Sequence, residues 1–277
     1  MRDVELQYGA ATDVGRVREV NEDAFLADRP VFVVADGMGG HQGGDVASAI
    51  VVEEFGALAG RAYDASGGAE TVAATLLECQ RRIAEYGAQQ SAQHAGQRRR
   101  RWYAGTTAVV ALLVRGDDGP RWLVANLGDS RAYRLDRDGL ERVSVDHSVV
   151  QQLVDAGRIT EADVATHPER HVITRAIGGP EPSEADFFDV PLTSAGRLLL
   201  CTDGVTGMID DAAIESILRQ AEDPRQAADR LVAAAVSAGG EDNATAVVVD
   251  VVGLTADSAD ATGLQRGSLE EKLGDLP

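Results

Sequence analysis

The chain has 277 residues, of which 44% are apolar, and its 26 basic and 45 acidic side chains give a net charge of −19. This length and apolar content fit one large globular domain or two small ones. The charge argues against a nucleic-acid-binding protein, which needs basic patches to neutralise phosphates, and it is compatible with carboxylates held near metal cations.

Membrane spans, secretion signals and disulfide frameworks are not indicated. No stretch approaches the roughly 18 apolar residues of a membrane span, and the polar first 30 residues show no signal peptide. Two cysteines, Cys79 and Cys201, cannot form a disulfide framework, so we expect two buried free thiols. The sequence therefore predicts a soluble protein of a reducing compartment, the cytoplasm.

The N-terminal half alternates predicted strands with two helices. In chain order we expect a strand over residues 31–35, helices over 46–58 and 69–88, and strands over 106–114 and 121–127. The turn-forming run at residues 115–120 predicts that the last two strands form an antiparallel hairpin. A strand over residues 133–135 is expected to continue this meander past Asp129.

Residues 146–180 differ in character from the rest of the chain. They are polar, hold three of the five histidines and suit a mobile flap over a site. Thr160 and Asp163 resemble a capping box. The other elements expected here and beyond are a helix over residues 148–156, strands near 187–190 and 198–202, a helix over 223–238, a strand over 243–252 and a polar tail over 254–277. Meanders of strands separated by pairs of helices predict an α+β layered fold with largely antiparallel sheets.

Acidic residues stand at the ends of several predicted strands. The end of one antiparallel strand and the start of its neighbour lie on the same edge of a sheet, so Asp36, Asp203 and Asp242 can converge. Glycines after Asp36 let a main-chain carbonyl approach an ion. One such aspartate would usually be only a turn residue. Because the pattern recurs, and Asp129 also follows a strand, the sequence predicts an enzyme that binds magnesium or manganese through oxygen ligands.

Seven short stretches carry a family resemblance that covers roughly residues 5–252. They are GRVREVNED at 15–23, VADGMGGH at 34–41, GTT at 105–107, NLGDSR at 126–131, TRAIG at 174–178, CTDG at 201–204 and GEDN at 240–243. In this order they resemble the bacterial branch of the metal-dependent serine/threonine protein phosphatases, the PPM or type 2C family. The resemblance implies a four-layer α-β-β-α sandwich over residues 1–253, with two mainly antiparallel sheets flanked by helices and a flap subdomain at about residues 146–180.

The resemblance also implies a centre of two manganese or magnesium ions, with a third ion in bacterial members. Asp36 would bridge the first two ions, and the carbonyl of Gly37 would bind one of them. Asp203 and Asp242 would bind the other. Asp129, together with Asp203, would hold the third ion, helped by the backbone near His171.

Other residues of the matching stretches are expected around these ions. Glu22 and Asp23 would act mostly through metal-bound waters, and Asn243 would support them from outside the ligand set. Arg18 occupies the phosphate-binding position of the family, where a planar guanidinium suits two phosphate oxygens. Eukaryotic relatives carry a histidine directly after the Asp-Gly pair. Here Met38 stands in its place, so the proton donor to the leaving group is open between a metal-bound water and a nearby histidine.

The expected reaction is hydrolysis of phosphoserine and phosphothreonine on proteins. A water between two cations has a lowered pKa and becomes a hydroxide that attacks phosphorus in line, while Arg18 and the metals neutralise charge on the phosphoryl oxygens. The resemblance implies that the enzyme opposes bacterial serine/threonine kinases. The expected partners are therefore phosphorylated proteins, including kinases and their substrates, with no nucleic acid and no membrane, and the chain is expected to be a monomer.

Several residues admit two interpretations. His41 is either a solvated or helix-entry residue or a proton donor. Residues 98–101, four consecutive arginines, form either a solvated loop or a contact for an acidic or phosphorylated peptide. His167 and His171 have a zinc-like spacing, but a proline between them favours the surface of the flap. Cys201 lacks the arginine six positions later that a cysteine phosphatase needs, so core packing is favoured.

The sequence disfavours three functions other than that of a phosphoprotein phosphatase. A regulatory phosphatase of the sigma-factor partner-switching type usually carries a sensor domain and poorer motifs, and this chain shows neither. A non-catalytic pseudophosphatase would lack one of the key aspartates, and all are present. A two-metal nuclease is disfavoured by the acidic charge and by the motif that contains Arg18.

Overall fold

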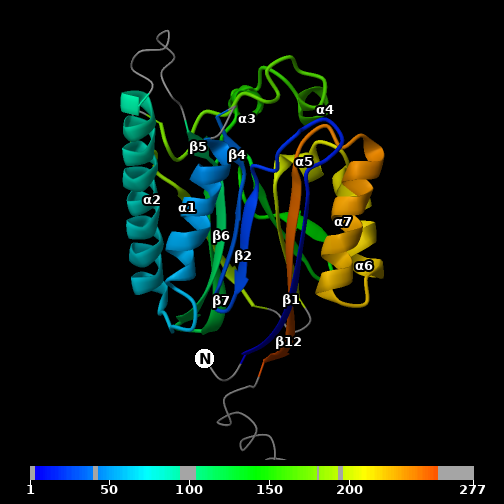
Figure 1. Cartoon of the computed structure of the whole chain (residues 1–277). Coiled ribbons are helices and arrows are strands. Elements are labelled where there is room, and N and C mark those ends of the chain that lie inside the picture. The colour runs from blue at the N-terminus through cyan, green and yellow to red at the C-terminus, as the bar shows by residue number, and fades with distance from the viewer. Residues whose placement is uncertain (1–3, 40–42, 94–103, 180, 193–195, 255–277) are drawn as a thin grey trace, which may run out of the picture.

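Two antiparallel sheets packed face to face form the centre of the molecule, and a pair of helices covers the outer face of each (Figure 1). The structure is a computed structural model that describes residues 4–39, 43–93, 104–179, 181–192 and 196–254. Each central sheet has five strands, and all their pairings are antiparallel. The four-layer α-β-β-α sandwich expected from the sequence is confirmed.

The first sheet joins the two ends of the described chain. Its strand order is β1 (Val4–Asp13), β12 (Ala244–Leu254), β11 (Arg197–Cys201), β8 (Arg131–Leu135) and β9 (Leu140–Arg142). Helices α6 (Asp211–Gln220) and α7 (Pro224–Ala238) cover its outer face. Asp223 begins α7 as an N-cap that accepts a hydrogen bond from Gln226 N at 2.8 Å, and Pro224 follows, as predicted.

The second sheet contains the predicted hairpin. Its order is β10 (Asp186–Pro191), β7 (Gly119–Leu127), β6 (Ala108–Gly116), β3 (Val31–Ala35) and β2 (Ala24–Asp28). Helices α1 (Gly44–Gly56) and α2 (Ala65–Gln93) cover its outer face. Two short strands, β4 (Gly37–Met38) and β5 (Gly105–Thr106), pair antiparallel with each other and form a separate two-stranded sheet.

The apolar runs are buried on both faces, which explains their lack of alternation. In β3, Phe32 and Val34 point into the core between the two sheets, whereas Val31 and Val33 pack under the helices. In β11, Leu198 and Leu200 face the other sheet, and Leu199 packs with α6 and α7. Burying both faces in this way fixes where each strand ends, and therefore where the acidic residues that follow it lie.

The structure differs from the sequence prediction at one crossover. We expected the strand after Asp129 to continue the β6–β7 meander, but β8 pairs with β11 and β9 in the other sheet. That prediction was wrong because a strand's own pattern does not say which sheet it joins. Asp129 therefore lies where the chain passes from one sheet to the other. Strands β1, β2 and β9 and helix α6 were not predicted.

The segment expected to form a flap contains two short helices, α3 (Val149–Asp155) and α4 (Glu161–Val164), at the upper end of the molecule in Figure 1. The capping box of Thr160 and Asp163 is confirmed. Strand β12 extends through Leu254, beyond its predicted end, and the rest of the predicted tail lies outside the described residues. No helix in the described part of the chain is long and apolar enough to cross a membrane.

Candidate active site

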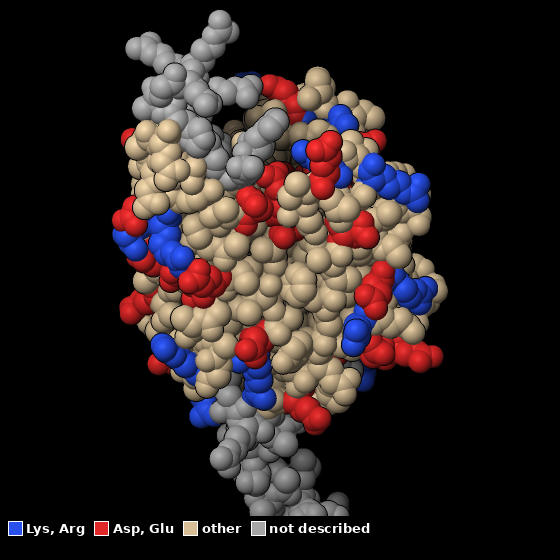
Figure 2. Space-filling view, in the orientation of Figure 1, with Lys and Arg blue, Asp and Glu red and all other residues tan. Residues whose placement is uncertain are grey.

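The predicted acidic residues meet at the upper end of the two sheets, where β4 and α5 (Asp203–Thr206) lie (Figure 1). Asp36 follows β3 in one sheet. Asp203 follows β11 and Asp242 precedes β12, which are antiparallel neighbours in the other sheet. The aspartates thus converge across two sheets. Figure 2 shows acidic side chains gathered at this end of the visible face.

Hydroxyl and amide groups fix the main chain at Asp36. Its N–H donates to Thr107 Oγ1 at 3.0 Å, and its carbonyl accepts from Thr107 N and from Thr106 Oγ1, each at 2.9 Å. Thr107 Oγ1 also lies 2.8 Å from Ser130 Oγ. The Asp36 backbone is therefore joined to the turn that carries Asp129.

Asn243 holds the loop that carries Arg18 and Glu22. Its side-chain Nδ2 donates to the carbonyls of Val14 and Val20 at 2.9 and 3.0 Å, and its Oδ1 accepts from Glu22 N at 2.8 Å. The amide has both donors and an acceptor in place, which neither Asp nor Ala could reproduce. The predicted supporting position of Asn243 thus corresponds to a buried structural contact with this loop.

Glycines let three segments approach one another at the site. A Cβ added at Gly204 would lie 1.8 Å from Asn243 O, and one at Gly37 would lie 2.2 Å from Gly44 O and 2.4 Å from Glu22 O. Larger residues would push apart the segments that carry the acidic side chains. The glycines after the strand-end aspartates are thus needed for close packing.

Arg18 lies at the mouth of the acidic cluster. Its Nη2 donates to Asp242 Oδ2 at 2.7 Å, and about half of its side chain, 52%, is exposed. Asp242 Oδ1 accepts from Asn243 N at 2.8 Å. The hydrogen bond with Asp242 raises the pKa of Arg18, and the charges of Asp36 and Glu22 raise it further, so the guanidinium remains charged.

Burial and neighbouring negative charges raise the pKa values of four aspartates here, Asp23, Asp36, Asp129 and Asp203. Burial, and then the charges of Asp203 and Asp23, raise the pKa of Asp36 well above its usual range. Burial raises the pKa of Asp23 to about 7, although the hydroxyls of Thr245 and Thr202 donate to its Oδ2 at 2.7 and 3.0 Å.

The pKa is raised in the same way at Asp129, in the turn between β7 and β8 where the chain crosses from one sheet to the other. Burial, followed by the charges of Asp203 and Asp146, raises the pKa of Asp129 to about 8. Burial and the charge of Asp242 raise the pKa of Asp203. A set of carboxylates that destabilise one another when ionised is a set that a divalent cation would stabilise.

The carboxylate oxygens of this cluster are the kind of ligand that hard cations such as Mg²⁺ and Mn²⁺ prefer. Asp203 Oδ1 is buried without a hydrogen-bond partner, and a buried anionic oxygen of this kind needs a partner from outside the protein. Within the described ranges, no three His, Cys, Asp or Glu side chains are arranged as they would be around a bound ion. Asp242 instead binds Arg18, and Asp23 binds two threonines. The backbone thus gathers the carboxylates, and cation binding requires their side chains to turn.

A second acidic pair adjoins this cluster and joins Glu22, which was predicted from the sequence, to Asp45, which was not. Burial raises the pKa of Glu22, and the nearby charge of Asp45 raises it further. Asp45 Oδ1 is buried without a hydrogen-bond partner. Ser48 Oγ donates to the carbonyl of Glu22 at 2.6 Å and fixes this corner to the first turn of α1. An acid in the first turn of a helix has an ordinary explanation in the helix dipole, so no sequence pattern pointed to Asp45.

The histidines, cysteines and arginines that admitted two interpretations have different outcomes. Burial raises the pKa of Asp203, and His171 lies near enough to offset part of this rise, so the predicted flap segment comes near the carboxylates. His167 accepts a hydrogen bond from Glu169 N at 3.2 Å and shares no metal-like group with His171. Cys79 and Cys201 are free and buried, as predicted. His41 and residues 98–101 lie outside the described residues.

Comparison with known proteins decides the family. Residues 15–238 match the protein phosphatase 2C family. The chain belongs to this family. The sequence-based assignment to bacterial PPM phosphatases, and with it the enzyme class of protein-serine/threonine phosphatase, is confirmed.

Two curated relatives of this phosphatase illustrate the similarity. The chain is 35% identical over 248 residues to the serine/threonine phosphatase stp of Listeria innocua, covering 86% of this chain and 93% of that protein. It is 37% identical over 251 residues to the serine/threonine protein phosphatase PstP of Mycobacterium tuberculosis, covering 89% of this chain and 45% of that protein.

Solved structures of PPM phosphatases share the fold. The crystal structure of Mycobacterium tuberculosis PstP superposes with a TM-score of 0.75 at 35% identity, covering 90% of this chain and 99% of that one. A structure of the PstP catalytic domain in complex with two manganese ions has a TM-score of 0.73 at 33% identity, with the same coverage of both chains.

Proposed function

We propose that this phosphatase hydrolyses phosphoserine and phosphothreonine on proteins with two manganese or magnesium ions held by Asp36, the Gly37 carbonyl, Asp203 and Asp242. The observation that carries the proposal is the convergence of these aspartates from two sheets, where burial and neighbouring carboxylates raise the pKa values of Asp36 and Asp203. When bound, the cations would supply activation of a water as a metal-bridging hydroxide and neutralisation of phosphoryl charge.

The surrounding residues have roles that their contacts support. Glu22 and Asp23 would contact the ions through waters, and Asn243 keeps Glu22 in place through its main chain. Asp129, with Asp203, would hold a third, weaker cation, since the charge of Asp203 raises the pKa of Asp129. A cation would relieve the repulsion between these carboxylates when they are ionised, and it would compete with protons for them.

Arg18 is proposed to bind the phosphate. Its guanidinium is half exposed and already faces an anionic oxygen of Asp242 at 2.7 Å. Asp242 could bind a cation and still accept from Arg18, because a carboxylate has two oxygens with about four lone pairs. The contact with Asp242 engages Nη2, and the other N–H groups of the guanidinium would be available for two phosphoryl oxygens. The guanidinium would orient the phosphate and offset its charge during attack.

We also propose the limits of the domain and the biological role of the enzyme. Residues 1–253 would form the phosphatase domain, with residues 146–180 as a flap and residues 254–277 as a tail. Free, buried cysteines support a reducing compartment such as the cytoplasm. The named activity of the relatives supports phosphorylated proteins as partners, including serine/threonine kinases and their substrates. We also propose that the enzyme acts as a monomer that opposes those kinases.

The test is hydrolysis of a phosphothreonine peptide with manganese and with EDTA. We expect activity only with the metal, and a loss of about a thousandfold or more in kcat/KM for Asp203→Asn, because both a cation ligand and its charge are removed. Asp189→Asn is a matched control, since this carboxylate lies on β10 with 52% of its side chain exposed. Activity that survives EDTA, or equal effects of the two substitutions, would contradict the proposal.

A further inference from the structure

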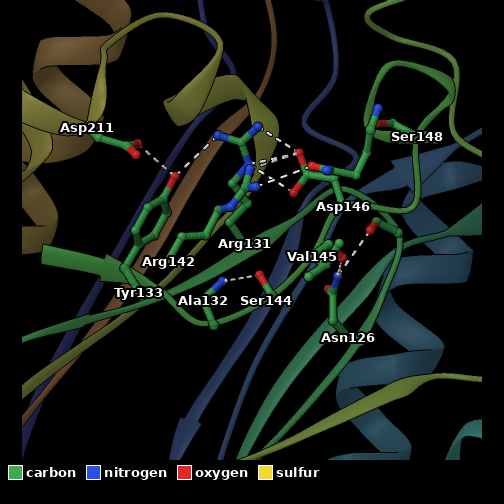
Figure 3. Close-up of polar contacts among 12 residues, drawn as sticks. Asn126, Arg131, Ala132, Tyr133, Arg142, Ser144, Val145, Asp146, Ser148 and Asp211 are labelled. Carbon is green, nitrogen blue, oxygen red and sulfur yellow. Dashed lines mark hydrogen bonds and ion pairs between the residues drawn. The ribbon is translucent and has the colours of Figure 1, made fainter. Parts of the chain in front are cut away.

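Residues 144–147, here called the clamp segment, run beside the crossover turn that carries Asp129. The clamp segment lies between β9 and α3. Each of its residues contacts the β7–β8 connection or the strand residues that flank it. Figure 3 shows part of this arrangement, with Arg131 turned toward Asp146 and Asn126 toward Val145. Asp146 and His147 begin the segment expected to form a flap, and no sequence pattern indicated their contacts with this turn.

The first two residues of the clamp segment bind the strands on either side of the turn. Ser144 Oγ accepts from Ala132 N at 2.9 Å, at the start of β8. Val145 carbonyl accepts from Asn126 Nδ2 at 2.9 Å, near the end of β7. Because one contact lies before Asp129 in sequence and the other after it, the clamp segment spans the turn.

Asp146 holds the residue two positions after Asp129. Its carboxylate is 8% exposed and accepts from Arg131 Nη2 at 2.7 Å and from Arg131 Nε at 3.0 Å. Arg131 also donates to the hydroxyl of Tyr133 at 3.2 Å, and that hydroxyl donates to Asp211 at 3.0 Å. The guanidinium is therefore fixed on two sides (Figure 3).

His147 holds the residue directly before Asp129. Its main-chain N–H donates to the Gly128 carbonyl at 2.9 Å, and its ring Nδ1 accepts from Gly128 N at 3.2 Å. The other ring nitrogen, Nε2, lies 3.2 Å from both Asp186 Oδ2 and Arg175 Nη1, so both sides of the ring have polar partners. Gly128 has a φ of +123°, and an added Cβ would lie 2.5 Å from Thr107 Cγ2, so the turn has little room to shift.

We propose that Asp146 and His147 are positioning residues for Asp129, which fix its turn from both sides and thereby set the affinity of the cation that Asp129 and Asp203 would share. This inference rests on the proposed function. Neither residue needs to touch substrate or the ions. Arg131 and Arg142, whose Nη1 lies 3.8 Å from Asp146 Oδ2, balance the negative charge that Asp146 brings near Asp129. Outer residues that orient metal ligands commonly influence affinity in this way.

The experiment is a manganese titration of the whole chain, followed by calorimetry and by the electron paramagnetic resonance signal of free Mn²⁺. In the wild type we expect two tight sites and one weaker site. Asp146→Asn and His147→Gln should weaken the third site about tenfold or more and leave the tight pair unchanged. His147→Asn should bind close to the wild type, because its amide oxygen can replace Nδ1 as acceptor for Gly128 N.

A matched control separates positioning from loss of stability. Arg197 and Asp250 form a similar ion pair, with contacts of 2.6 and 2.7 Å, at the other end of β11 from Asp203. Asp250→Asn should lower the melting temperature and leave all three manganese sites unchanged. If Asp146→Asn does not fold, the His147→Gln and His147→Asn pair decides the question.

Two results would overturn the inference in distinguishable ways. Loss of the weak cation in Asp129→Ala, but not in Asp146→Asn or His147→Gln, would refute the positioning role and leave the proposed function intact. Retention of the weak cation in Asp129→Ala would refute the third site itself, and the inference with it.

Discussion

The metal-free protein is expected to lose stability as the pH rises, because its buried carboxylates must then ionise next to one another. Burial and neighbouring charges raise the pKa of Asp23 to about 7 and of Asp129 to about 8, whereas an unfolded aspartate titrates near 4. Between these values the folded state keeps protons that the unfolded state has released. The free energy of unfolding therefore falls from about pH 4 up to the folded pKa and is level above it.

The size of the effect follows from these values. Each group changes the free energy of unfolding by about 1.4 kcal/mol per pH unit. Between pH 5.5 and 7.0 the loss is therefore about 2 kcal/mol for Asp129 and a similar amount for Asp23. The lowered pKa of His147, caused mainly by its burial, acts in the opposite direction. The difference between wild type and Asp129→Asn isolates the aspartate.

The assay is urea unfolding in EDTA at several pH values, followed by the fluorescence of Trp122, which is buried between the sheets. Asp129→Asn should lose about 2 kcal/mol less than the wild type between pH 5.5 and 7.0. Excess manganese is the control, since cations favour the ionised carboxylates and should remove the decline. Equal pH dependence of the wild type and Asp129→Asn in EDTA would refute the reasoning.

Three further substitutions probe separate parts of the site. Arg18→Ala should lower kcat/KM for a phosphothreonine peptide about 10- to 100-fold, through loss of charge-assisted hydrogen bonds, while calorimetry shows unchanged manganese affinity. Asn243→Asp should cost about 2–4 kcal/mol in urea unfolding, because the carbonyls of Val14 and Val20 lose their donor. Gly204→Ala should cost about 3 kcal/mol or more and lower the melting temperature, since its Cβ would overlap Asn243 O. Wild-type values in these assays would contradict the respective contacts.

The parts of the fold that the sequence predicts are those with strong local signals. Strand β3 is an uninterrupted apolar run, and α7 begins with an Asp-Pro cap and ends at glycine. Helix α6 was missed because it is short and buries only Ile214 and Leu218. Strand β1 was missed because its mixed burial gives no clear alternation.

In the site, too, the residues with strong local signals could be predicted from the sequence, and those that depend on tertiary contacts could not. Asp36, Asp203 and Asp242 were predictable because each follows or precedes a buried strand, so the length of the strand fixes its place. His147 was not, since its partners Gly128 and Asp186 are distant in sequence and the ring is buried only by tertiary contacts. The orientation of Arg18 toward Asp242 likewise depends on how the N-terminal loop packs.

The central claim is that Asp36 and its partners from the other sheet hold two catalytic cations. The most direct measurement is the manganese content of wild type and Asp36→Asn after equilibrium dialysis, by mass spectrometry, on protein shown to be folded by circular dichroism. We predict two tightly bound ions in the wild type and loss of both, together with peptide hydrolysis, in Asp36→Asn. An Asp36→Asn protein that keeps two tight ions and full activity would contradict the claim.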